Sequence, residues 1–578
     1  MKRKNKIESP FRYWFIISLF IFITFVLFAR AVYIQVINAD FYKEQGDMRS
    51  VRLIIDSVHR GSIMDRNGEE LAISTPVESI CAEPRKVLKA EKSDFIALAK
   101  TLDISEQKLY SRLSKNIKRN FLYLDRHARM DRVKKIKELS IKGVYTQSEY
   151  KRYYPSAEIT AHIIGFTNID DMGQEGIELA YDKILKGNSG KKRVLKDRKR
   201  RTVRDIESVT PSRPGTDIYL SIDKRIQYLA HREISTAVKK YGAKAGSLVM
   251  LDVKTGEVIA MVGQPSFNPN NRRGMDISTI RNRNVTDSYE PGSTMKVFTI
   301  AAGLESEIFT PLTIIDTSPG TFRVGDKSIK DHRNYGSIDL TTIITKSSNI
   351  GASKIALALK PKYFYDVLTR FGFGQTTSSG YPGEQAGVLR FYDKWSEQDI
   401  AALSFGYGIQ ITPLKLAQAY SVIANDGIKL PVSFIKTDKS YKGERVISEN
   451  IARQIRTMLE NVVSSGTARK AAIEGYRVLG KTGTTLKYNF EDGEYHDDRY
   501  RSLFVGIVPA VNPRFVTVVV VDEPEKSLGY YGGDVAAPIF SRVMEGALRI
   551  LDVPPDNLNG FNNSIIANVE IEQGLEKY

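Results

Sequence analysis

Glu290-Pro291-Gly292-Ser293-Thr294-Met295-Lys296 is the stretch around which this sequence is organised, because it places a serine after a Pro-Gly break and a lysine three residues further on. The residues that follow, up to Glu305, are largely apolar and predict a buried helix that begins at Ser293. Residues three apart share one face of a helix, so the Lys296 amine can reach the Ser293 hydroxyl and remove its proton. The positive end of the helix favours the resulting alkoxide and disfavours an ammonium. The stretch therefore predicts an activated serine nucleophile.

Two further motifs strengthen this prediction, because the spacing Ser-x-x-Lys alone recurs at several other places in the chain. Ser347-Ser348-Asn349 follows the serine, and Lys481-Thr482-Gly483-Thr484 follows that. This ordered trio is typical of penicillin-binding proteins and class A β-lactamases. A rival trio of Ser433, Ser448-x-Asn450 and Lys481 is disfavoured, since its short separations leave little chain to fold around a shared cleft.

The apolar runs around these motifs predict a sheet covered by helices. A second Lys-Thr-Gly, at 254–256, lies between the apolar runs 247–253 and 257–262, so we interpret it as a hairpin turn. Strands are predicted at 502–508 and 514–522, and the uniformly apolar run Val516–Val521 indicates a central strand covered on both faces. A helix is predicted over 341–358, with Ser347 and Asn349 near its beginning.

Length, charge and cysteine content limit the possible classes of protein. A chain of 578 residues suggests two or more domains. The formal net charge of +18 is compatible with nucleic-acid binding, but the densest basic run, 191–204, has no interleaved aromatic residues. We predict an exposed loop or hairpin there, with an anionic partner as the alternative, and no nucleic-acid binding. The single cysteine, Cys81, excludes an intramolecular disulfide, and we predict neither a metal nor a cofactor.

The amino-terminus predicts a membrane anchor. Basic residues precede an apolar stretch that runs from Trp14 to Ile37 and is long enough to span a bilayer. Positive residues before such a span place the tail, 1–12, in the cytoplasm, the anchor at 13–37 and the remaining chain outside. A cleaved signal peptide is the alternative, because Ala29-Arg30-Ala31 has the form of a cleavage site. The bulky residues that extend the apolar stretch to Ile37 favour the retained anchor.

The rest of the chain is predicted to form two domains and a tail. Residues 38–214 mix short strands and helices without a nucleophile, and Pro/Gly punctuation near Pro211–Gly215 marks the boundary. Residues 215–555 hold the three motifs, and the asparagine-rich end, 556–578, is predicted to be a disordered tail.

The chain resembles the class B penicillin-binding proteins, the monofunctional peptidoglycan transpeptidases, over nearly its whole length. The stretches similar to that family's recurring segments, besides the trio, are Arg60-Gly61, Asp65-Arg66-x-Gly68, Gly165-Phe166-Thr167-Asn168, Gly173–Glu178, Ser404–Gly408 and Thr412-Pro413. The segments Gln45–Ser50 and Tyr530–Gly533 are more similar to the division-specific, septal members than to the elongation members.

The resemblance implies an α+β architecture: one transmembrane helix, an elongated α+β pedestal of the dimerisation type, and a transpeptidase domain with a mainly antiparallel central sheet covered by helices on both faces. It also implies an acyl-enzyme on Ser293, with Lys296 as the base. Ser347 relays protons to the leaving amine, and Asn349 orients Lys296 and the donor peptide.

The third motif has its own implied roles. Lys481 and Thr482 bind the terminal carboxylate, and Gly483 leaves room for a peptide along the strand. The backbone N–H groups of Ser293 and Thr484 form the oxyanion hole.

The implied partners are peptidoglycan stem peptides, β-lactam antibiotics, the inner membrane, a membrane-embedded septal glycosyltransferase and other division proteins. A D,D-carboxypeptidase or an elongation-type transpeptidase remains open, because water and amine acceptors leave no mark in these motifs. A mainly structural division scaffold is the alternative from another class. A deacylating β-lactamase would need a glutamate such as Glu384, which we interpret as part of a structural loop.

Overall fold

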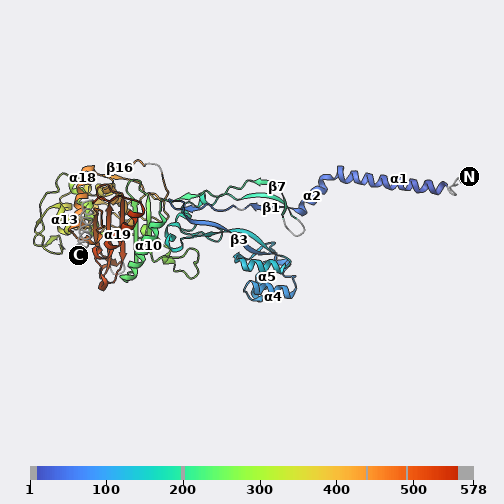
Figure 1. Cartoon of the computed structure of the whole chain (residues 1–578), viewed down its shortest axis with the longest axis horizontal. Coiled ribbons are helices and arrows are strands. Elements are labelled where there is room, and N and C mark those ends of the chain that lie inside the picture. Colours follow the sequence, from blue (N-terminus) through green and yellow to red (C-terminus); the bar gives the residue numbers. More distant parts are fainter. Residues whose placement is uncertain (1–9, 57, 197–201, 438–440, 490–492, 558–578) are drawn as a thin grey trace, which may run out of the picture. The chain divides into compact units, whose positions relative to one another are not determined.

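The computed structural model describes residues 10–56, 58–196, 202–437, 441–489 and 493–557, and the chain divides into two compact units (Figure 1). The smaller unit comprises Met1–His59 and Gly187–Gly215, and the larger one comprises Arg60–Lys186 and Thr216–Tyr578. This division groups residues that contact one another and does not test the predicted domain boundaries, which stay predictions. The predicted disordered tail lies outside the described residues from position 558 onward.

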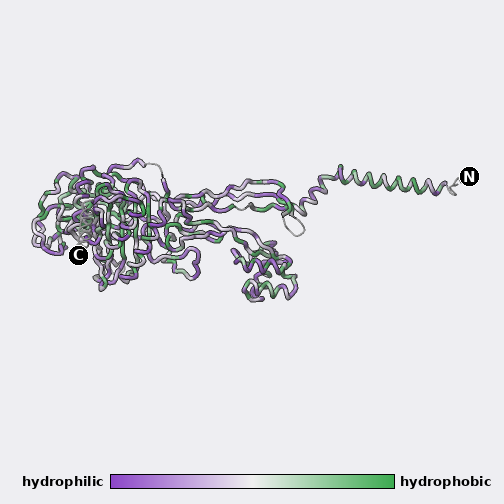
Figure 2. The backbone as a smooth tube through the Cα atoms, viewed as in Figure 1, coloured by the Kyte–Doolittle hydropathy of each residue, from purple (hydrophilic) through white to green (hydrophobic). Residues whose placement is uncertain are grey.

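The smaller unit consists of the N-terminal helices and a three-stranded sheet. Helix α1 (Pro10–Val32) continues as a π-helical turn, η1 (Tyr33–Ile37), and together they form the apolar helix that was predicted (Figure 2). Within the described part of the chain, it is the one helix long and apolar enough to cross a membrane. Helix α2 (Ala39–Ser50) leads into β1 (Val51–Asp56).

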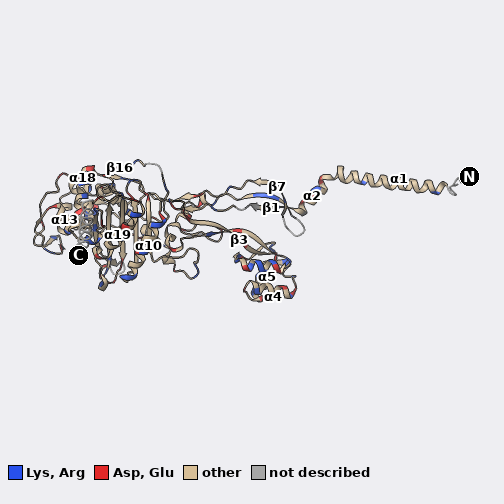
Figure 3. Cartoon of the chain, viewed as in Figure 1, with Lys and Arg blue, Asp and Glu red and all other residues tan. Residues whose placement is uncertain are grey.

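The basic run of the sequence lies mainly in this sheet. Strand β1 pairs with β6 (Gly190–Lys196), which pairs in turn with β7 (Thr202–Thr210), and both pairings are antiparallel. The run therefore forms the two arms of a hairpin, which is one of the two structures predicted for it, a loop or a hairpin (Figure 3). Residues 197–201 lie outside the described chain. Lys192 and Arg193 approach Asp205 and Glu207 across the pair, at 3.3 and 3.4 Å.

The larger unit begins with a small sheet in the order β4-β3-β2-β8, in which β5 also pairs with β3. The bounds are β2 (Ile63–Met64), β3 (Glu70–Ala82), β4 (Leu122–Ala128), β5 (Val144–Tyr153) and β8 (Ile218–Tyr219). The helices beside it are α3 (Pro84–Val87), α4 (Lys92–Thr101), α5 (Glu106–Lys115) and α6 (Met130–Leu139). Leu98, Leu109 and Val133 of these helices share a small core with Ile80 and Leu124 of the sheet.

A five-stranded antiparallel sheet in the order β10-β9-β19-β18-β17 forms the centre of the remaining chain. The bounds are β9 (Ala245–Asp252), β10 (Val258–Gln264), β17 (Leu479–Asn489), β18 (Glu494–Val508) and β19 (Phe515–Asp522). Strand β19 is the central strand and is buried almost throughout, which confirms the prediction for Val516–Val521. Residues 254–256 form the turn between β9 and β10, also as predicted.

Helices cover both faces of this sheet, as predicted. Helices α10 (Lys224–Lys240) and α19 (Gly532–Ile550) pack against each other and against one face. Helices α17 (Pro413–Ala424) and α18 (Glu449–Ser464) pack against the other face. The remaining helices of this part are α11 (Arg283–Thr286), α12 (Lys296–Glu305), α13 (Leu340–Lys346), α14 (Asn349–Leu357), α15 (Pro361–Arg370) and α16 (Glu397–Ser404).

A buried ion cluster fastens the segment that precedes β2. Arg60 Nε donates to Glu178 Oε2 and Arg152 Nε donates to Glu178 Oε1, both at 2.6 Å, and the side chains of Arg60 and Glu178 are 0% exposed. Arg60 Nη1 also donates to Asp182 at 2.7 Å. A buried charge is tolerated when it is paired and hydrogen-bonded, so one glutamate that satisfies two buried guanidinium groups is the key member of this cluster.

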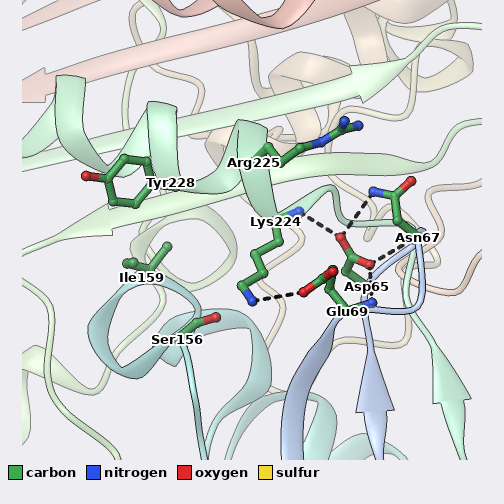
Figure 4. A pocket seen from close by; sticks show the side chains of 8 residues that line it. All are labelled: Asp65, Asn67, Glu69, Ser156, Ile159, Lys224, Arg225 and Tyr228. Atoms are coloured by element: carbon green, nitrogen blue, oxygen red, sulfur yellow. Dashed lines mark hydrogen bonds and ion pairs between the residues drawn. The ribbon is translucent and has the colours of Figure 1, made fainter. Parts of the chain in front are cut away.

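The turn at Asp65–Gly68 caps helix α10 from a distant part of the chain (Figure 4). Asp65 Oδ1 accepts from the backbone N–H groups of Asn67 and Glu69, at 2.7 and 2.9 Å, which closes the turn. Asp65 Oδ2 accepts from the backbone N–H of Lys224 at 3.1 Å, while the local cap Asp223 accepts from Arg225 N at 3.0 Å. Two carboxylates therefore satisfy the first N–H groups of this helix.

We predict that Glu178→Gln lowers the stability of the protein by about 3–5 kcal/mol, because it leaves two buried guanidinium groups facing a neutral amide. Thermal unfolding of the full-length protein in detergent measures the effect. Glu69→Gln is the matched control, since Glu69 forms an exposed pair with Lys224 at 3.4 Å and such pairs contribute little. Equal midpoints for the two variants would contradict the role assigned to Glu178.

Candidate active site

The predicted nucleophile lies in a tight turn that precedes the regular helix. Gly292–Met295 forms a 3₁₀ turn, and α12 begins at Lys296, whereas the sequence predicted a helix from Ser293 onward. Gly292 has a φ of +55°, a conformation that glycine adopts at little cost, and a Cβ at this position would lie 2.3 Å from Thr485 Cγ2. The break at glycine turns the chain sharply and leaves Ser293 partly exposed at the start of a buried helix.

Backbone contacts hold this turn in place. Gly292 N–H donates to Gly406 O at 3.2 Å, and a Cβ on Gly406 would lie 2.1 Å from Gly292 O. Tyr420 OH donates to Thr294 O at 2.8 Å from helix α17. Below the turn, Phe298 meets three aromatic rings edge-on, those of Phe371, Phe373 and Tyr420. The nucleophile is therefore attached to a rigid, fully packed helix.

The Lys296 amine is completely buried and bonds to the second motif. Its Nζ donates to Ser347 O at 2.6 Å, to Asn349 Oδ1 at 2.7 Å and to Ser347 Oγ at 3.1 Å. No hydrogen bond joins Lys296 Nζ to Ser293 Oγ in the described chain, although the spacing placed the two residues on one helical face. The three acceptors satisfy an ammonium, and hydrogen bonds of catalytic pairs often tighten only when substrate binds.

Ser347 lies at a break between two helices, where the sequence predicted a single helix over 341–358. Helix α13 ends at Lys346, Ser347 adopts a left-handed conformation with φ 60° and ψ 44°, and α14 begins at Asn349. The prediction of one helix was wrong because Ser347 takes the left-handed C-terminal cap of α13, and Ser348 then starts α14 by accepting from Gly351 N at 2.9 Å. This break directs the Ser347 hydroxyl toward the two lysines.

The third motif lies on the edge strand β17. Lys481 Nζ donates to Ser347 Oγ at 3.0 Å, so this hydroxyl accepts from both buried lysines. Thr482 Oγ1 lies 2.9 Å from Thr467 Oγ1, and Thr484 Oγ1 accepts from Gly532 N at 3.0 Å. The third motif is thereby connected to the second through Ser347.

Gly483 of this motif lies against the nucleophile turn. A Cβ at Gly483 would lie 3.1 Å from both Pro291 O and Thr294 Cγ2, and 3.3 Å from Leu503 Cβ. These are tight contacts on the side of the strand that faces the turn. The absence of a side chain therefore makes room for the nucleophile turn itself, a reason that sequence reasoning did not provide.

The pair of buried lysines has shifted acid–base properties. Burial lowers the pKa of Lys481 to about 7. Burial and then the positive charge of Lys481 hold the pKa of Lys296 well below its ordinary value, whereas the Asp331 carboxylate acts in the opposite direction. Two amines with lowered pKa values that share one hydroxyl can accept, hold and pass a proton.

Sequence reasoning missed Asp331, which follows β13 (Lys327–Lys330). Asp331 accepts from the backbone N–H groups of Asn349 and Ile350, at 2.5 and 3.1 Å, and from Ser348 Oγ at 2.6 Å. No local signal identifies this residue, because it lies 18 positions before Asn349 and joins the second motif only in the folded chain.

A cavity of about 550 Å³ opens in front of these groups. Ser293, Ser347, Thr482 and Thr484 of the predicted residues line it, together with His332, Thr467, Tyr500, Tyr530 and Tyr531. Lys296 and Lys481 are fully buried and donate to the Ser347 hydroxyl, and the half-buried Asn349 accepts from Lys296 Nζ. A partly exposed hydroxyl, a buried amine relay and an edge strand that can pair with a peptide together suit acyl transfer to or from a peptide.

The Glu384 carboxylate forms hydrogen bonds within its own loop, and Glu384 is not among the residues that line this cavity. Its Oε1 and Oε2 accept from Thr377 N and Ser379 Oγ, both at 2.6 Å, so the carboxylate closes its own loop. This supports the interpretation of Glu384 as a structural residue.

Two family profiles match the chain. Residues 55–220 match the family described as "Penicillin-binding Protein dimerisation domain". Residues 246–545 match the family described as "Penicillin binding protein transpeptidase domain", and this segment contains all three motifs.

Curated relatives match over nearly the full length. The chain is 42% identical over 548 residues to the peptidoglycan D,D-transpeptidase FtsI of Escherichia coli K12, which covers 94% of this chain and 92% of that protein. It is 40% identical over 550 residues to the probable peptidoglycan D,D-transpeptidase PbpC of Pseudomonas aeruginosa, which covers 95% of this chain and 96% of that protein.

Solved structures show the same architecture. A peptidoglycan synthetase from Bifidobacterium adolescentis matches with a TM-score of 0.69 and 25% identity, over 88% of this chain and 98% of that one. Penicillin binding protein 3 from Mycobacterium tuerculosis, complexed with aztreonam, matches with a TM-score of 0.68 and 27% identity, over 87% of this chain and 98% of that one.

We predict that Gly406→Ala lowers the thermal unfolding midpoint more than Gly336→Ala does. Both glycines have positive φ, at +90° and +69°, so each alanine costs about 1 kcal/mol in backbone strain. A Cβ on Gly336 meets nothing within 4 Å, whereas a Cβ on Gly406 meets the backbone of Gly292. The overlap adds about 1–3 kcal/mol, and a midpoint for Gly406→Ala no lower than that of the control would refute the close approach.

Proposed function

Because this chain belongs to the class B penicillin-binding proteins, the peptidoglycan D,D-transpeptidases, we propose that it cross-links stem peptides through an acyl-enzyme formed on Ser293. The observation that carries this assignment is the Ser347 hydroxyl, which accepts from Lys296 Nζ at 3.1 Å and from Lys481 Nζ at 3.0 Å. All three motifs of the sequence thereby meet at one wall of one cavity, with Ser293 on it.

The first half-reaction replaces a peptide bond by an ester. Ser293 Oγ attacks the carbonyl carbon between the last two D-alanines, and its proton passes to the neutral amine of Lys296. The C–N bond then breaks, and the Ser347 hydroxyl relays a proton from the lysine pair to the departing amine of the terminal D-alanine. The lowered pKa of Lys296 supports its part as base, because a buried amine gives up its proton more readily than an exposed one.

The remaining residues bind and orient the donor peptide. Lys481, with Thr482, binds the terminal carboxylate, and Asn349 orients Lys296 and the donor backbone. The N–H groups of Ser293 and Thr484 form the oxyanion hole, where the loss of one donor costs roughly 3–4 kcal/mol of transition-state stabilisation. The position of β17 at the edge of the sheet supports strand-like pairing of the donor along Gly483, because an edge strand has unpaired backbone groups.

The second half-reaction completes the cross-link. An amine of a neighbouring stem peptide attacks the ester carbonyl, Ser293 leaves as its hydroxyl, and the new amide joins the two strands. A β-lactam reaches the same serine because it mimics the D-alanyl-D-alanine end, and its ring opening leaves an ester on Ser293.

The chain's organisation supports a septal enzyme of the inner membrane. The apolar helix at Pro10–Ile37 fits a single-pass anchor, with residues 1–12 in the cytoplasm and the catalytic domain in the periplasm. The two family matches support a pedestal at 38–214 and a transpeptidase domain at 215–555. A full-length likeness to an FtsI protein supports work at the division septum, together with a membrane-embedded glycosyltransferase and other division proteins.

We predict that incubation with a penicillin adds the mass of one drug molecule to the parent protein and nothing to Ser293→Ala. Intact-mass spectrometry of the detergent-solubilised protein measures this, and Ser278→Ala, an exposed serine of the short turn Ile277–Thr279, is the matched control. An unmodified parent beside intact drug would remove Ser293 from its catalytic role. Consumption of the drug without an adduct would instead identify a hydrolase.

We predict a bell-shaped pH dependence for the second-order rate constant of acylation by benzylpenicillin. The rate rises as Lys296 loses its proton, and it falls above about pH 7, where Lys481 becomes neutral and attracts the drug's carboxylate less strongly. The pKa of Lys481 is lowered, so its charge is present below that value and lost above it. Stopped-flow measurements with the methyl ester of the drug are the control, because the ester lacks the carboxylate that Lys481 attracts. If the rate with the ester also falls above about pH 7, this fall cannot arise from Lys481.

A further inference from the structure

Asp331 bonds to the start of the helix that carries the second motif, although it comes from a different part of the chain. It follows the hairpin of β12 (Thr321–Val324) and β13, and its carboxylate is partly buried. Oδ1 accepts from two backbone N–H groups of α14, and Oδ2 accepts from the hydroxyl of Ser348, the residue before that helix. All the partners of this carboxylate are therefore in or next to the motif at 347–349.

We propose that Asp331 is a positioning residue for acyl transfer: it fixes the first turn of α14, so that Asn349 and Ser347 face Lys296, and it supplies the negative charge that balances the buried lysine pair. This inference rests on the proposed function, because it assigns a role within the same reaction.

The orientation of Asn349 follows from its contacts with the Asp331 segment. Its backbone N–H donates to Asp331 Oδ1 at 2.5 Å, and its Nδ2 donates to the carbonyl of the preceding residue, Lys330, at 2.9 Å. With the amide nitrogen held there, the amide oxygen is left to accept from Lys296 Nζ at 2.7 Å. The Lys330-Asp331 segment thus determines which end of the amide faces the catalytic amine.

Helix capping alone does not account for this arrangement. Helix α14 already has a local cap, because Ser348 Oγ accepts from Gly351 N at 2.9 Å. Helix α13, directly before it, has the local cap Asp339, which accepts from Thr342 N at 2.8 Å. Asp331 therefore adds a second acceptor, from a distant segment, to a helix start that Ser348 already caps.

The charges that face Lys296 make the balance explicit. Lys481 approaches from β17 and shares the acceptor Ser347, and both amines are 0% exposed. Asp331 and the adjacent His332 approach from the segment after β13, and His332 lines the cavity. Asp534 also lines the cavity and is paired with Lys470 at 2.7 Å. Asp331 is therefore the carboxylate near the two buried amines, and it favours the protonated form of Lys296.

The test compares Asp331→Asn with Asp339→Asn in the full-length protein in detergent. An asparagine at 331 keeps an oxygen for the two N–H groups of α14 and can donate to Ser348 Oγ, so it removes the charge and conserves the cap. Asp339→Asn makes the same change at the cap of α13, since asparagine and aspartate cap helices equally well. Asp331→Ala removes both charge and cap.

We expect the acid limb of the benzylpenicillin acylation profile to move by about one pH unit to lower pH in Asp331→Asn, because the charge that raises the pKa of Lys296 is gone. We also expect the plateau rate to fall by about tenfold, because a weaker base removes the serine proton less effectively. Asp339→Asn should reproduce the parent profile, and thermal unfolding should show both asparagine variants near the parent midpoint and Asp331→Ala below it.

The proposal is overturned if Asp331→Asn keeps the parent's acid limb and plateau while Asp331→Ala changes only the unfolding midpoint, because Asp331 is then a cap and nothing more. That result leaves the Ser293 adduct of the parent intact and so does not affect the proposed function. A parent protein that forms no adduct would overturn both.

Discussion

One hydroxyl group, Ser347 Oγ, accepts hydrogen bonds from two fully buried lysine amines, and the arrangement of the cavity depends on this shared acceptor. A buried amine without partners is costly, so Lys296 and Lys481 must both come within about 3 Å of acceptors or lose their protons. One lysine comes from a helix and the other from a strand. The shared hydroxyl therefore fixes the distance between α12 and the edge of the sheet.

Close backbone contacts make that distance possible. Gly483 lies against the nucleophile turn and Gly292 against Thr485, so β17 and the turn approach more closely than side chains would permit. The opposite side of the turn is held by Gly406 and Tyr420. Ser293 stays partly exposed while its neighbours Gly292 and Thr294 are held by these contacts, an arrangement that favours preorganised catalysis.

Much of this could be predicted from the sequence, and the two exceptions at the site have different physical causes. Local composition and spacing predict the order of the three motifs, the turn at 254–256 and the central strand Val516–Val521. The structure contains this turn and this strand. The prediction of one helix across Ser347 joined the apolar residues on either side of it and passed over the polar stretch Lys346-Ser347-Ser348-Asn349, in which serine and asparagine are typical of helix ends. The left-handed conformation of Ser347 belongs to a local helix end, because its backbone N–H donates to the carbonyl groups of Ile343 and Ile344 in α13. Asp331 was missed for a different reason, since its partners are distant in the sequence and no local pattern marks a non-local cap.

The capping of α10 by Asp65 has a consequence for the order in which the chain folds. The carboxylate and the N–H group it accepts from are 159 positions apart, so the helix cannot gain this partner until the chain between them has closed a long loop. Ribosomal synthesis delivers Asp65 well before Lys224. The acceptor is therefore already part of the chain when the helix is made, and the cap forms only once the two segments meet. Such a contact slows folding relative to a local cap, because the loop must close before the contact can stabilise the fold.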